Sequence, residues 1–282
     1  MKIGIIGNGF VGRATNKLEC KDVNVIIYDV IPKLCSPPTT TLYDICNCDI
    51  IFISVPTPMN KDGSCHINIL KAVLSQINGI VRICDKLIVI RSTVPPGTCD
   101  NLDCYFMPEF LTEKNYINDF INNSNWIFGL KGKPLDNEFK TKITELINLS
   151  YKNNKIKHNT INFVTNKEAE MIKLFRNNFL ATKISFCNEM YQFCNKKDIN
   201  YENVRKLAVL DKRIGESHTN VPGHDGKHGF GGTCFPKDTN NMLHELKKNN
   251  VDSYIINGVV NRNEKIDRPE HDWKKNAGRA VI

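Results

Sequence analysis

The chain has 282 residues, of which 41% are hydrophobic and 24% charged, and its formal net charge is +8 at pH 7. This composition is typical of a soluble protein with one large or two medium domains, and no apolar run reaches the roughly 18 to 20 residues that a membrane span needs. The positive charge suits anionic ligands such as phosphates, but scattered lysines without an aromatic-basic stripe argue against nucleic acid as a partner.

The first predicted element is a buried strand at residues 2–6, followed at once by the turn Gly7-Asn8-Gly9-Phe10-Val11-Gly12 and a helix over residues 11–19. In such a turn the first glycine makes the bend, the second admits a pyrophosphate, and the third lets the helix pack on the strand. The helix N-terminus then directs its partial positive charge at the phosphates. A strand at 23–28 ends in Asp29, whose carboxylate would bind ribose hydroxyls and repel a 2′-phosphate. These features predict an NAD site.

Further strands are predicted downstream, each ending in a loop with turn residues or polar groups. They cover residues 49–55, 86–91, 105–107 and 126–130, with helices at 67–81 and 133–157. The strand at 126–130 is expected to close the sheet. Ligands bind at the carboxyl ends of the strands in an open parallel sheet, which is where these loops should lie.

Residues 166–196 contain no proline or glycine and are rich in Ile, Leu, Phe and Met. A segment that is apolar on most of its circumference is predicted to be a long helix buried on several sides. Because this helix has more apolar surface than one subunit can cover, we expect a homodimer through it. Lys173 and Asn177 are four residues apart and so neighbours on one helix face. A buried ammonium is costly without a partner, and the local sequence supports a functional Lys173 and a solvated lysine equally.

A second glycine-rich segment, Gly229-Phe230-Gly231-Gly232-Thr233-Cys234-Phe235-Pro236-Lys237-Asp238, lies near the C-terminus. Three glycines in four positions let the backbone pass close to a ligand. A thiolate is a good nucleophile toward a carbonyl, and a neighbouring lysine and aspartate supply charge stabilisation and proton handling. The alternative is a glycine turn before a helix, with Cys234 buried and inert, which is the commoner situation for an isolated cysteine.

The remaining candidate ligand residues do not predict a metal site. The eleven cysteines include no C-x-x-C pair and are expected to be reduced, mostly buried thiols. His218, His224 and His228 fit no standard metal spacing and are expected to be solvated loop residues. The N-terminus leads straight into a strand and is too short for a signal peptide, so we expect a cytoplasmic protein.

Taken together, eight sequence blocks resemble the nucleotide-sugar dehydrogenases of the UDP-glucose 6-dehydrogenase / GDP-mannose dehydrogenase family. They occur in the family's order and cover residues 1 to about 245. The blocks are Gly-Asn-Gly-Phe-Val-Gly at 7–12, Val-Pro-Thr-Pro at 55–58, Ser-Thr-Val-Pro-Pro-Gly-Thr at 92–98, Pro-Glu-Phe-Leu-Thr-Glu at 108–113, Glu-Ala-Glu-Met-Ile-Lys-Leu-Phe-Arg-Asn at 168–177, Asn-Glu at 188–189, Arg-Ile-Gly at 213–215 and the segment at 229–238.

The fold class that we expect is α/β. An N-terminal Rossmann dinucleotide-binding domain should span residues 1–158. An all-helical domain built on the long central helix should span residues 159–282, with the catalytic Cys loop, the dimer contacts and a polar C-terminal tail. Family members usually carry a further Rossmann-like domain that clasps the nucleotide half of the substrate, and this chain stops too soon to contain one.

The resemblance implies a catalytic role for each matching residue. Cys234 would capture an aldehyde as a thiohemiacetal. Lys173 and Asn177 would stabilise the oxyanion, and Asp238 with a held water would handle the alcohol proton. The water that hydrolyses the thioester would be placed and activated by Thr93, Glu109 and Glu113.

The resemblance also implies NAD as the cofactor and a nucleotide sugar as the substrate. The residues expected to bind the cofactor are Gly7, Gly9, Phe10, Val11, Gly12, Asp29, Val55, Thr57, Ser92, Thr93 and Lys237. Those expected to bind the substrate are Phe110, Leu111, Lys173, Asn177, Arg213, Phe230, Gly231 and Phe235. In this family Arg213 would often reach the substrate from the partner subunit.

The activity favoured by these assignments is NAD-dependent, four-electron oxidation of a nucleotide-sugar primary alcohol to the uronic acid, with UDP-glucose to UDP-glucuronate as the first choice. The acid is expected because a two-electron alcohol dehydrogenase needs no covalent nucleophile. The alternatives are another substrate, such as GDP-mannose, a UDP-N-acetylhexosamine or a small hydroxyacid, and an NAD-binding regulatory protein left after domain loss.

Overall fold

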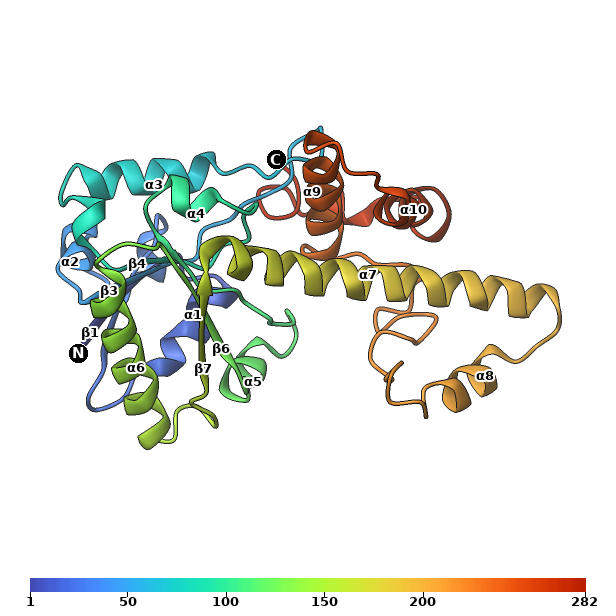
Figure 1. The fold of residues 1–282 in the computed structure, drawn as a ribbon, viewed down its shortest axis with the longest axis horizontal. Coiled ribbons are helices and arrows are strands. Elements are labelled where there is room, and N and C mark those ends of the chain that lie inside the picture. The colour runs from blue at the N-terminus through green and yellow to red at the C-terminus, as the bar shows by residue number, and fades with distance from the viewer. The chain divides into compact units, whose positions relative to one another are not determined.

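The structure is a computed structural model that describes all 282 residues (Figure 1). The chain divides into two compact units, each assembled from two stretches of sequence. Unit 1 comprises Met1–Thr57 and Ile67–Lys173, and unit 2 comprises Pro58–His66 and Leu174–Ile282. The division that we predicted at residue 158 stays a prediction about domains.

Unit 1 is built on one seven-stranded sheet in the order β2-β1-β3-β4-β5-β6-β7. The neighbouring strands are parallel except β5 and β6, which are antiparallel, so that the last two strands run opposite to the other five. The strands are β1 (Lys2–Ile6), β2 (Asn24–Tyr28), β3 (Ile50–Ile53), β4 (Ile88–Ile90), β5 (Tyr105–Phe106), β6 (Trp126–Leu130) and β7 (Ile161–Thr165).

The expectation that residues 126–130 close the sheet is wrong, because β7 pairs with β6 along its whole length. Every residue of β7 is partly or fully exposed. An edge strand of this kind lacks the buried, continuous apolar run that identified the central strands.

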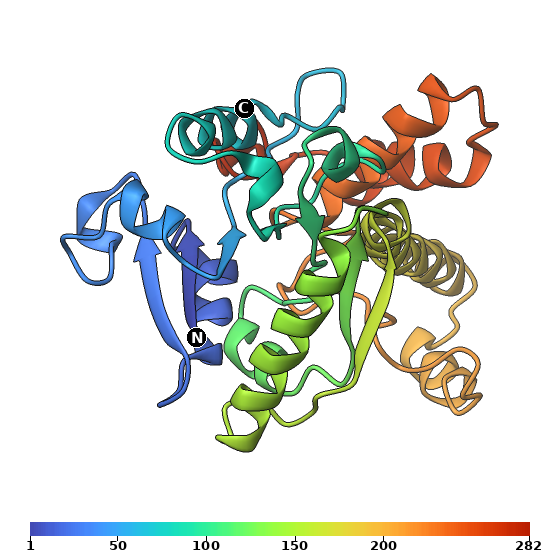
Figure 2. The ribbon, with the colours of Figure 1, turned by 60° about the vertical axis from the view of Figure 1, so that its left-hand side comes forward.

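Helices cover both faces of the sheet, because strands such as β3 are buried on both sides and need an apolar layer on each. Residues of α1, α5 and α6 pack into the core on one face, and residues of α2, α3 and α4 pack into the core on the other. Figure 1 and Figure 2 show α3 and α6 on opposite sides of the strands. The helices are α1 (Phe10–Thr15), α2 (Leu42–Cys46), α3 (Asn68–Asn78), α4 (Thr98–Asn101), α5 (Tyr116–Ile121) and α6 (Asp136–Lys152).

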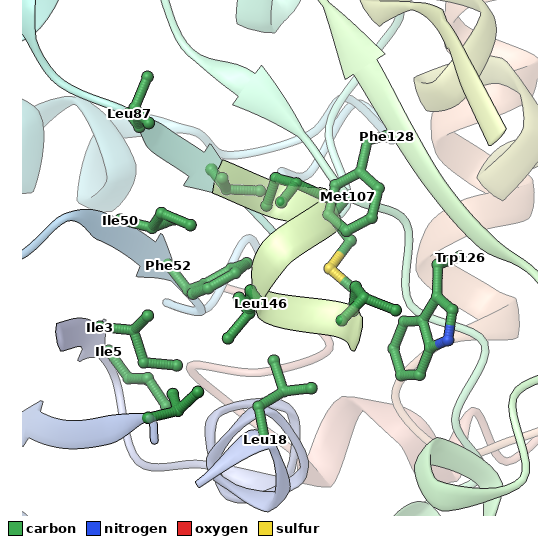
Figure 3. Packing of buried hydrophobic residues seen from close by; sticks show 14 of the residues in the cluster. Ile3, Ile5, Leu18, Ile50, Phe52, Leu87, Met107, Trp126, Phe128 and Leu146 are labelled. Carbon is green, nitrogen blue, oxygen red and sulfur yellow. The ribbon is translucent and has the colours of Figure 1, made fainter. Parts of the chain in front are cut away.

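The first of these cores combines strand residues with the apolar face of α6. Figure 3 shows Ile3 and Phe52 of the sheet on the same side as Leu146 of α6. Two aromatic rings lock the same layer, since Tyr105 and Phe139 are stacked with ring centroids 3.6 Å apart. Buried rings contribute much of the apolar area in a core of this size, and this pair joins α6 to β5.

Unit 2 is helical and contains most of the longest element, α7 (Asn166–Lys196), whose first residues belong to unit 1. The predicted α/β Rossmann region followed by a helical region built on this long helix is therefore confirmed. The other helices are α8 (Tyr201–Ala208), α9 (Phe235–Lys248) and α10 (Tyr254–Arg262), followed by short helical turns at Asn263–Asp267 and Asp272–Lys275. None of the helices is both long enough and apolar enough to span a membrane.

One face of α7 differs from the expectation of burial on several sides. Phe175, Phe179, Phe186 and Phe193 are each more than half exposed. Their spacing of four and seven residues places exposed rings repeatedly along the helix.

The early segment of unit 2 pairs with the end of the chain. The N–H of Met59 donates to the carbonyl of Ala280 at 2.9 Å, and the N–H of Ile282 donates to the carbonyl of Met59 at 3.1 Å. Because Pro58–His66 is flanked in sequence by residues of unit 1, unit 2 consists of two pieces that meet through backbone hydrogen bonds.

Candidate active site

The glycine turn after β1 has the geometry that a dinucleotide requires. Gly7 has a φ of +93°, which favours glycine, and a Cβ on Gly12 would collide with the carbonyl oxygen of Gly7. The third glycine is therefore needed for α1 to pack closely on β1. No atom lies within 4 Å of the position that a Cβ on Gly9 would occupy, so this part of the backbone is bare and open to a phosphate.

Asp29, at the end of β2, is hydrogen-bonded to this turn. Its Oδ2 accepts from the N–H of Asn8 at 2.7 Å, and its Oδ1 accepts from the N–H of Ile31 at 2.9 Å. The Oδ1 of Asn8 is buried and has no hydrogen-bond partner in the protein. The bare turn, the carboxylate beside it and this unmatched acceptor together fit NAD, with Asp29 placed to accept from the ribose hydroxyls.

The loops after β3 and β4 are tied to each other at the carboxyl edge of the sheet. The Oγ1 of Thr57 donates to the carbonyl of Thr93 at 2.8 Å, and the Oγ of Ser92 donates to the carbonyl of Val55 at 2.6 Å. The strand order reverses between β1 and β3, and ligands bind outside the carboxyl ends of the strands at such a point. The structure thus brings these four predicted residues together at the edge that the glycine turn also occupies.

A buried charge cluster follows β5. The Nζ of Lys173 donates to Oε1 of Glu109 at 2.5 Å, and the N–H of Leu111 donates to Oε2 at 2.9 Å. Lys173 is 3% exposed and Glu109 is 5% exposed. The solvated-lysine alternative is therefore wrong for Lys173, because its ammonium is buried and paired with a carboxylate.

Arg91 is a third charged member of this cluster. It is 2% exposed, and its guanidinium donates to the Oγ1 of Thr15 on α1 at 2.5 Å. Burial lowers the pKa of Arg91 to about 10, while Glu109 opposes that shift. Burial alone would raise the pKa of Glu109, but Lys173, the N–H of Leu111 and Arg91 more than offset it, so that this pKa lies below its ordinary value. Glu109 is therefore ionised at neutral pH.

Glu170 braces the loop that carries Ser92 and Thr93. Its carboxylate, which is fully buried, accepts from the N–H of Gly97 at 2.5 Å and from the N–H of Cys99 at 2.8 Å. Burial raises the pKa of Glu170 to about 6, and the two N–H groups oppose the rise. Glu170 lies one helical turn before Lys173 on α7, so the same helix turn supports the loop and supplies the buried ammonium.

Unit 2 contains the predicted nucleophile and the residues around it. Cys234 is partly exposed and forms the N-cap of α9, the helix that carries Lys237 and Asp238 in its first turn. The carboxylate of Asp238 accepts from the Nδ2 of Asn177 at 2.5 Å and from the Nζ of Lys237 at 2.5 Å. With Asp238 only 1% exposed, the arrangement is a buried carboxylate held by an amide and an ammonium.

Lys237 connects this carboxylate electrostatically to the thiol. Burial alone would lower the pKa of Lys237, but the charges of Asp238, Cys234 and Cys65 more than offset it, so the pKa lies above its ordinary value. A cation and a helix N-terminus both favour a thiolate. Cys234 thus stands in the kind of surroundings that activate a nucleophilic thiol rather than in an apolar core.

The other predicted substrate residues have varied surroundings. Arg213 is exposed and bonded to Asp211. Phe230 is buried with Ala181 and Val259, and its ring lies edge-to-face against Phe235. Glu113 lies on an exposed turn, Phe110, Leu111, Gly231 and Phe235 are partly buried, and Phe10 and Val11 open α1. The roles of these residues stay predictions.

Sequence reasoning missed Arg91 and Glu170. Arg91 directly follows the apolar run 87–90 and directly precedes Ser92, and that contrast was a usable signal. Glu170 precedes Lys173 by three residues in a predicted helix, which placed it on the same face. No three His, Cys, Asp or Glu side chains are grouped so as to hold a metal ion.

Two family models match the chain. One, described as the NAD binding domain of the UDP-glucose/GDP-mannose dehydrogenase family, matches residues 38–147, and the central domain of the same family matches residues 167–265. The two matches together span most of the chain; the first includes Glu109, and the second includes Lys173 and Cys234.

Curated relatives and solved structures are similar to the same region. A UDP-glucose 6-dehydrogenase of Rickettsia bellii is 34% identical over 234 residues, which is 79% of this chain and 50% of the relative. The UDP-glucose 6-dehydrogenase TuaD of Bacillus subtilis is 31% identical over 311 residues, 94% of this chain and 63% of the relative. A UDP-glucose dehydrogenase structure from Pyrobaculum islandicum is 24% identical with a TM-score of 0.77, covering 93% of this chain and 68% of that one. The chain spans about half the length of the first of these curated relatives.

Proposed function

Because the chain belongs to the UDP-glucose/GDP-mannose dehydrogenase family, we propose that it uses NAD to oxidise the primary alcohol of a nucleotide sugar to a carboxylic acid. The proposed substrate is UDP-glucose and the product UDP-glucuronate, since the curated relatives that match are named UDP-glucose 6-dehydrogenase. The observation that carries the proposal is the position of Cys234 at the N-terminus of α9, beside Lys237 and the buried carboxylate of Asp238.

The proposed chemistry has two oxidations and one hydrolysis, and NAD supplies the hydride acceptor for both oxidations. In the first, the alcohol loses a hydride and a proton, and Asp238 accepts that proton through a held water. The aldehyde carbon then forms a bond to the Sγ of Cys234, giving a thiohemiacetal. Loss of the second hydride and of the hydroxyl proton gives a thioester, and water attack breaks the C–S bond and releases the acid and the thiolate. One alcohol and one water thus give one acid, two hydrides and two protons.

The other residues would act on charge and on water. Lys173 and Asn177 carry N–H donors on α7 and would stabilise the oxyanion that forms at the sugar carbon. Glu109, which is ionised at neutral pH, would accept a proton from the hydrolytic water, and Thr93 and Glu113 would place that water. Each residue has a chemical type suited to its role.

The test is a Cys234→Ser variant, with Cys84→Ser as its control because Cys84 is exposed and outside the site. We expect Cys234→Ser to bind NAD with the affinity of the unmodified protein and to form no uronate, while Cys84→Ser keeps both properties. NAD affinity is measured by calorimetry and uronate by mass spectrometry. Uronate production by Cys234→Ser at the rate of the unmodified protein would contradict the covalent mechanism.

The substrate is tested separately. A thermal-shift screen with NAD present should give its largest shift with UDP-glucose, against GDP-mannose, UDP-N-acetylhexosamines and small hydroxyacids. A larger shift with another compound would move the proposal to that substrate. Binding of NAD without reduction of NAD by any of these compounds would favour a regulatory NAD-binding protein.

We also propose that the protein is a cytoplasmic homodimer that associates through α7. Each subunit would have two domains, residues 1–158 and 159–282, and Arg213 would contact the substrate bound by the partner subunit. Phe179, Phe186 and Phe193 recur every seven residues and are exposed, which is the spacing of a helix seam. Light scattering should give a dimer at micromolar concentration. Phe186→Glu should shift the protein to monomer, and a monomeric unmodified protein would exclude this interface.

A further inference from the structure

The glycine-rich segment before Cys234 is held by a residue that follows α10. The side chain of Asn263 forms two hydrogen bonds to the backbone of Phe230. Its Oδ1 accepts from the N–H of Phe230 at 2.8 Å, and its Nδ2 donates to the carbonyl of Phe230 at 3.0 Å. Asn263 is 1% exposed and Phe230 is 3% exposed. Because the oxygen and the nitrogen of this buried amide are both hydrogen-bonded to Phe230, they fix the backbone of that residue at its N–H and at its carbonyl.

A second residue of the same stretch holds the backbone two residues earlier. The Nε of Arg268 donates to the carbonyl of His228 at 3.0 Å. Its remaining nitrogens form ion pairs with Asp225 at 2.5 Å and with Asp272 at 3.2 Å, and the guanidinium is 2% exposed. Arginine is suited to this position because its planar fork can satisfy a carbonyl and two carboxylates at once.

These two side chains explain why the segment needs glycines. A Cβ on Gly229 would collide with the Oδ1 of Asn263, and a Cβ on Gly231 would collide with the guanidinium of Arg268. The glycines are therefore required by contacts with the protein itself, in addition to any contact with a ligand.

The stretch that carries Asn263 and Arg268 is itself anchored. Trp273 is 1% exposed, and Lys227 pairs with Glu270 and Asp272 at 2.8 Å each. The segment from 263 to 273 thus meets the segment from 225 to 231 at several separate points. Four residues after Phe230 the chain reaches Cys234 and the start of α9.

We propose that residues 263–273 act as a clamp that sets the position of the Cys234 thiol at the N-terminus of α9, with Asn263 and Arg268 as positioning residues. The role in catalysis rests on the proposed function, whereas the placement of the thiol does not. Nothing in the sequence pattern at 263–273 marks these residues, because their partners are 33 and 40 residues away.

The test compares Asn263→Ala with Asn261→Ala. Asn261 lies two residues earlier, and its side chain bonds only to Asn257 on its own helix, so it is a matched control. The readout is the ratio of the alkylation rates of Cys234 by iodoacetate and by iodoacetamide, resolved by peptide mass spectrometry. A thiol held beside a cation prefers the anionic reagent, and loss of that placement should lower the ratio by about fivefold.

We expect the lower ratio in Asn263→Ala and an unchanged ratio in Asn261→Ala, with the same NAD affinity in both. With a sugar nucleotide that is oxidised, kcat should fall by about a hundredfold in Asn263→Ala while the KM for NAD stays constant, because a small misplacement of a nucleophile is costly. Arg268→Lys keeps a charge between Asp225 and Asp272, so its alkylation ratio should lie between those of Asn263→Ala and Asn261→Ala. This variant carries the test if Asn263→Ala does not fold.

Two results separate the clamp from the proposed function. An unchanged alkylation ratio in folded Asn263→Ala, alongside faster amide hydrogen exchange at Phe230, would overturn the clamp, because the loop would then be looser without moving the thiol. A lowered ratio in Asn263→Ala, together with an unmodified protein that oxidises no sugar nucleotide, would support the clamp and overturn the proposed function.

Discussion

Replacing Lys173 with methionine would leave the carboxylate of Glu109 buried without its main counterion. Methionine keeps most of the length of the side chain, so the change removes charge with little change of volume. Removing one partner of a buried ion pair costs about 3–5 kcal/mol of unfolding free energy. Glu109 keeps the hydrogen bond from the N–H of Leu111 and the nearby charge of Arg91. We therefore expect Lys173→Met to lower the unfolding free energy by about 3 kcal/mol, the lower end of that range.

The cost should depend on pH with a definite sign. In the unmodified protein the pKa of Glu109 lies below its ordinary value of 4.5, so the stabilisation is present above pH 4.5 and is lost as pH falls through the native pKa. Without Lys173, burial is the largest remaining influence and the pKa should rise above 4.5. The variant then loses stability as pH rises through that new value, and the difference between the two proteins widens from acid to neutral pH.

The assay is urea unfolding at about pH 5 and about pH 8, with Lys167→Met as the control. Lys167 is exposed on the same helix, and its replacement should cost little. The double variant Lys173→Met/Glu109→Gln, which removes both charges, should be more stable at pH 8 than Lys173→Met alone. A cost below about 1 kcal/mol for Lys173→Met at pH 8, or an equal cost at both pH values, would refute the reasoning.

Three further predictions follow from other parts of unit 1. Gly12→Ala should weaken NAD binding and lower the unfolding free energy by about 1–3 kcal/mol, because its Cβ would collide with the carbonyl of Gly7; calorimetry and urea unfolding measure the two effects. Glu170 has a pKa raised from 4.5 to about 6, so the native protein keeps a proton that the unfolded chain releases, and its contribution should lower stability by about 2 kcal/mol as pH rises through that window. Glu170→Gln should remove this slope from urea titrations across pH 4.5 to 7. Phe139→Ala should cost about 3–5 kcal/mol in urea unfolding, because the ring is buried and stacked on Tyr105; a cost below that of an exposed-site control would contradict it.

The sequence predicted those parts of the fold whose causes are local. The turn at residues 7–12 was recognisable because strand, glycines and helix follow one another without interruption. The long helix at 166–196 was recognisable because an apolar run without proline or glycine has no other regular structure of that length. In both cases the residues that determine the element lie within the element.

The sequence did not predict contacts between distant segments. Glu109 and Lys173 are 64 residues apart, and only the family resemblance brought them into one list. The strand β7 was missed because its half-exposed residues carry no burial pattern. No sequence pattern predicts the contact of Asn263 with Phe230, because a buried asparagine has the same sequence signature as an exposed one.

The two-piece construction of unit 2 has a consequence for biosynthesis. Met59 leaves the ribosome about 220 residues before Ala280, its backbone partner, and at about 5–20 residues per second that gap lasts on the order of ten seconds or more. During this interval Met59 lacks its partner at the end of the chain, although residues 58–66 can already form hydrogen bonds among themselves. The speed of translation between Met59 and Ala280 should therefore influence the yield of native protein. Chaperones would have their longest opportunity to bind before Met59 pairs with the end of the chain.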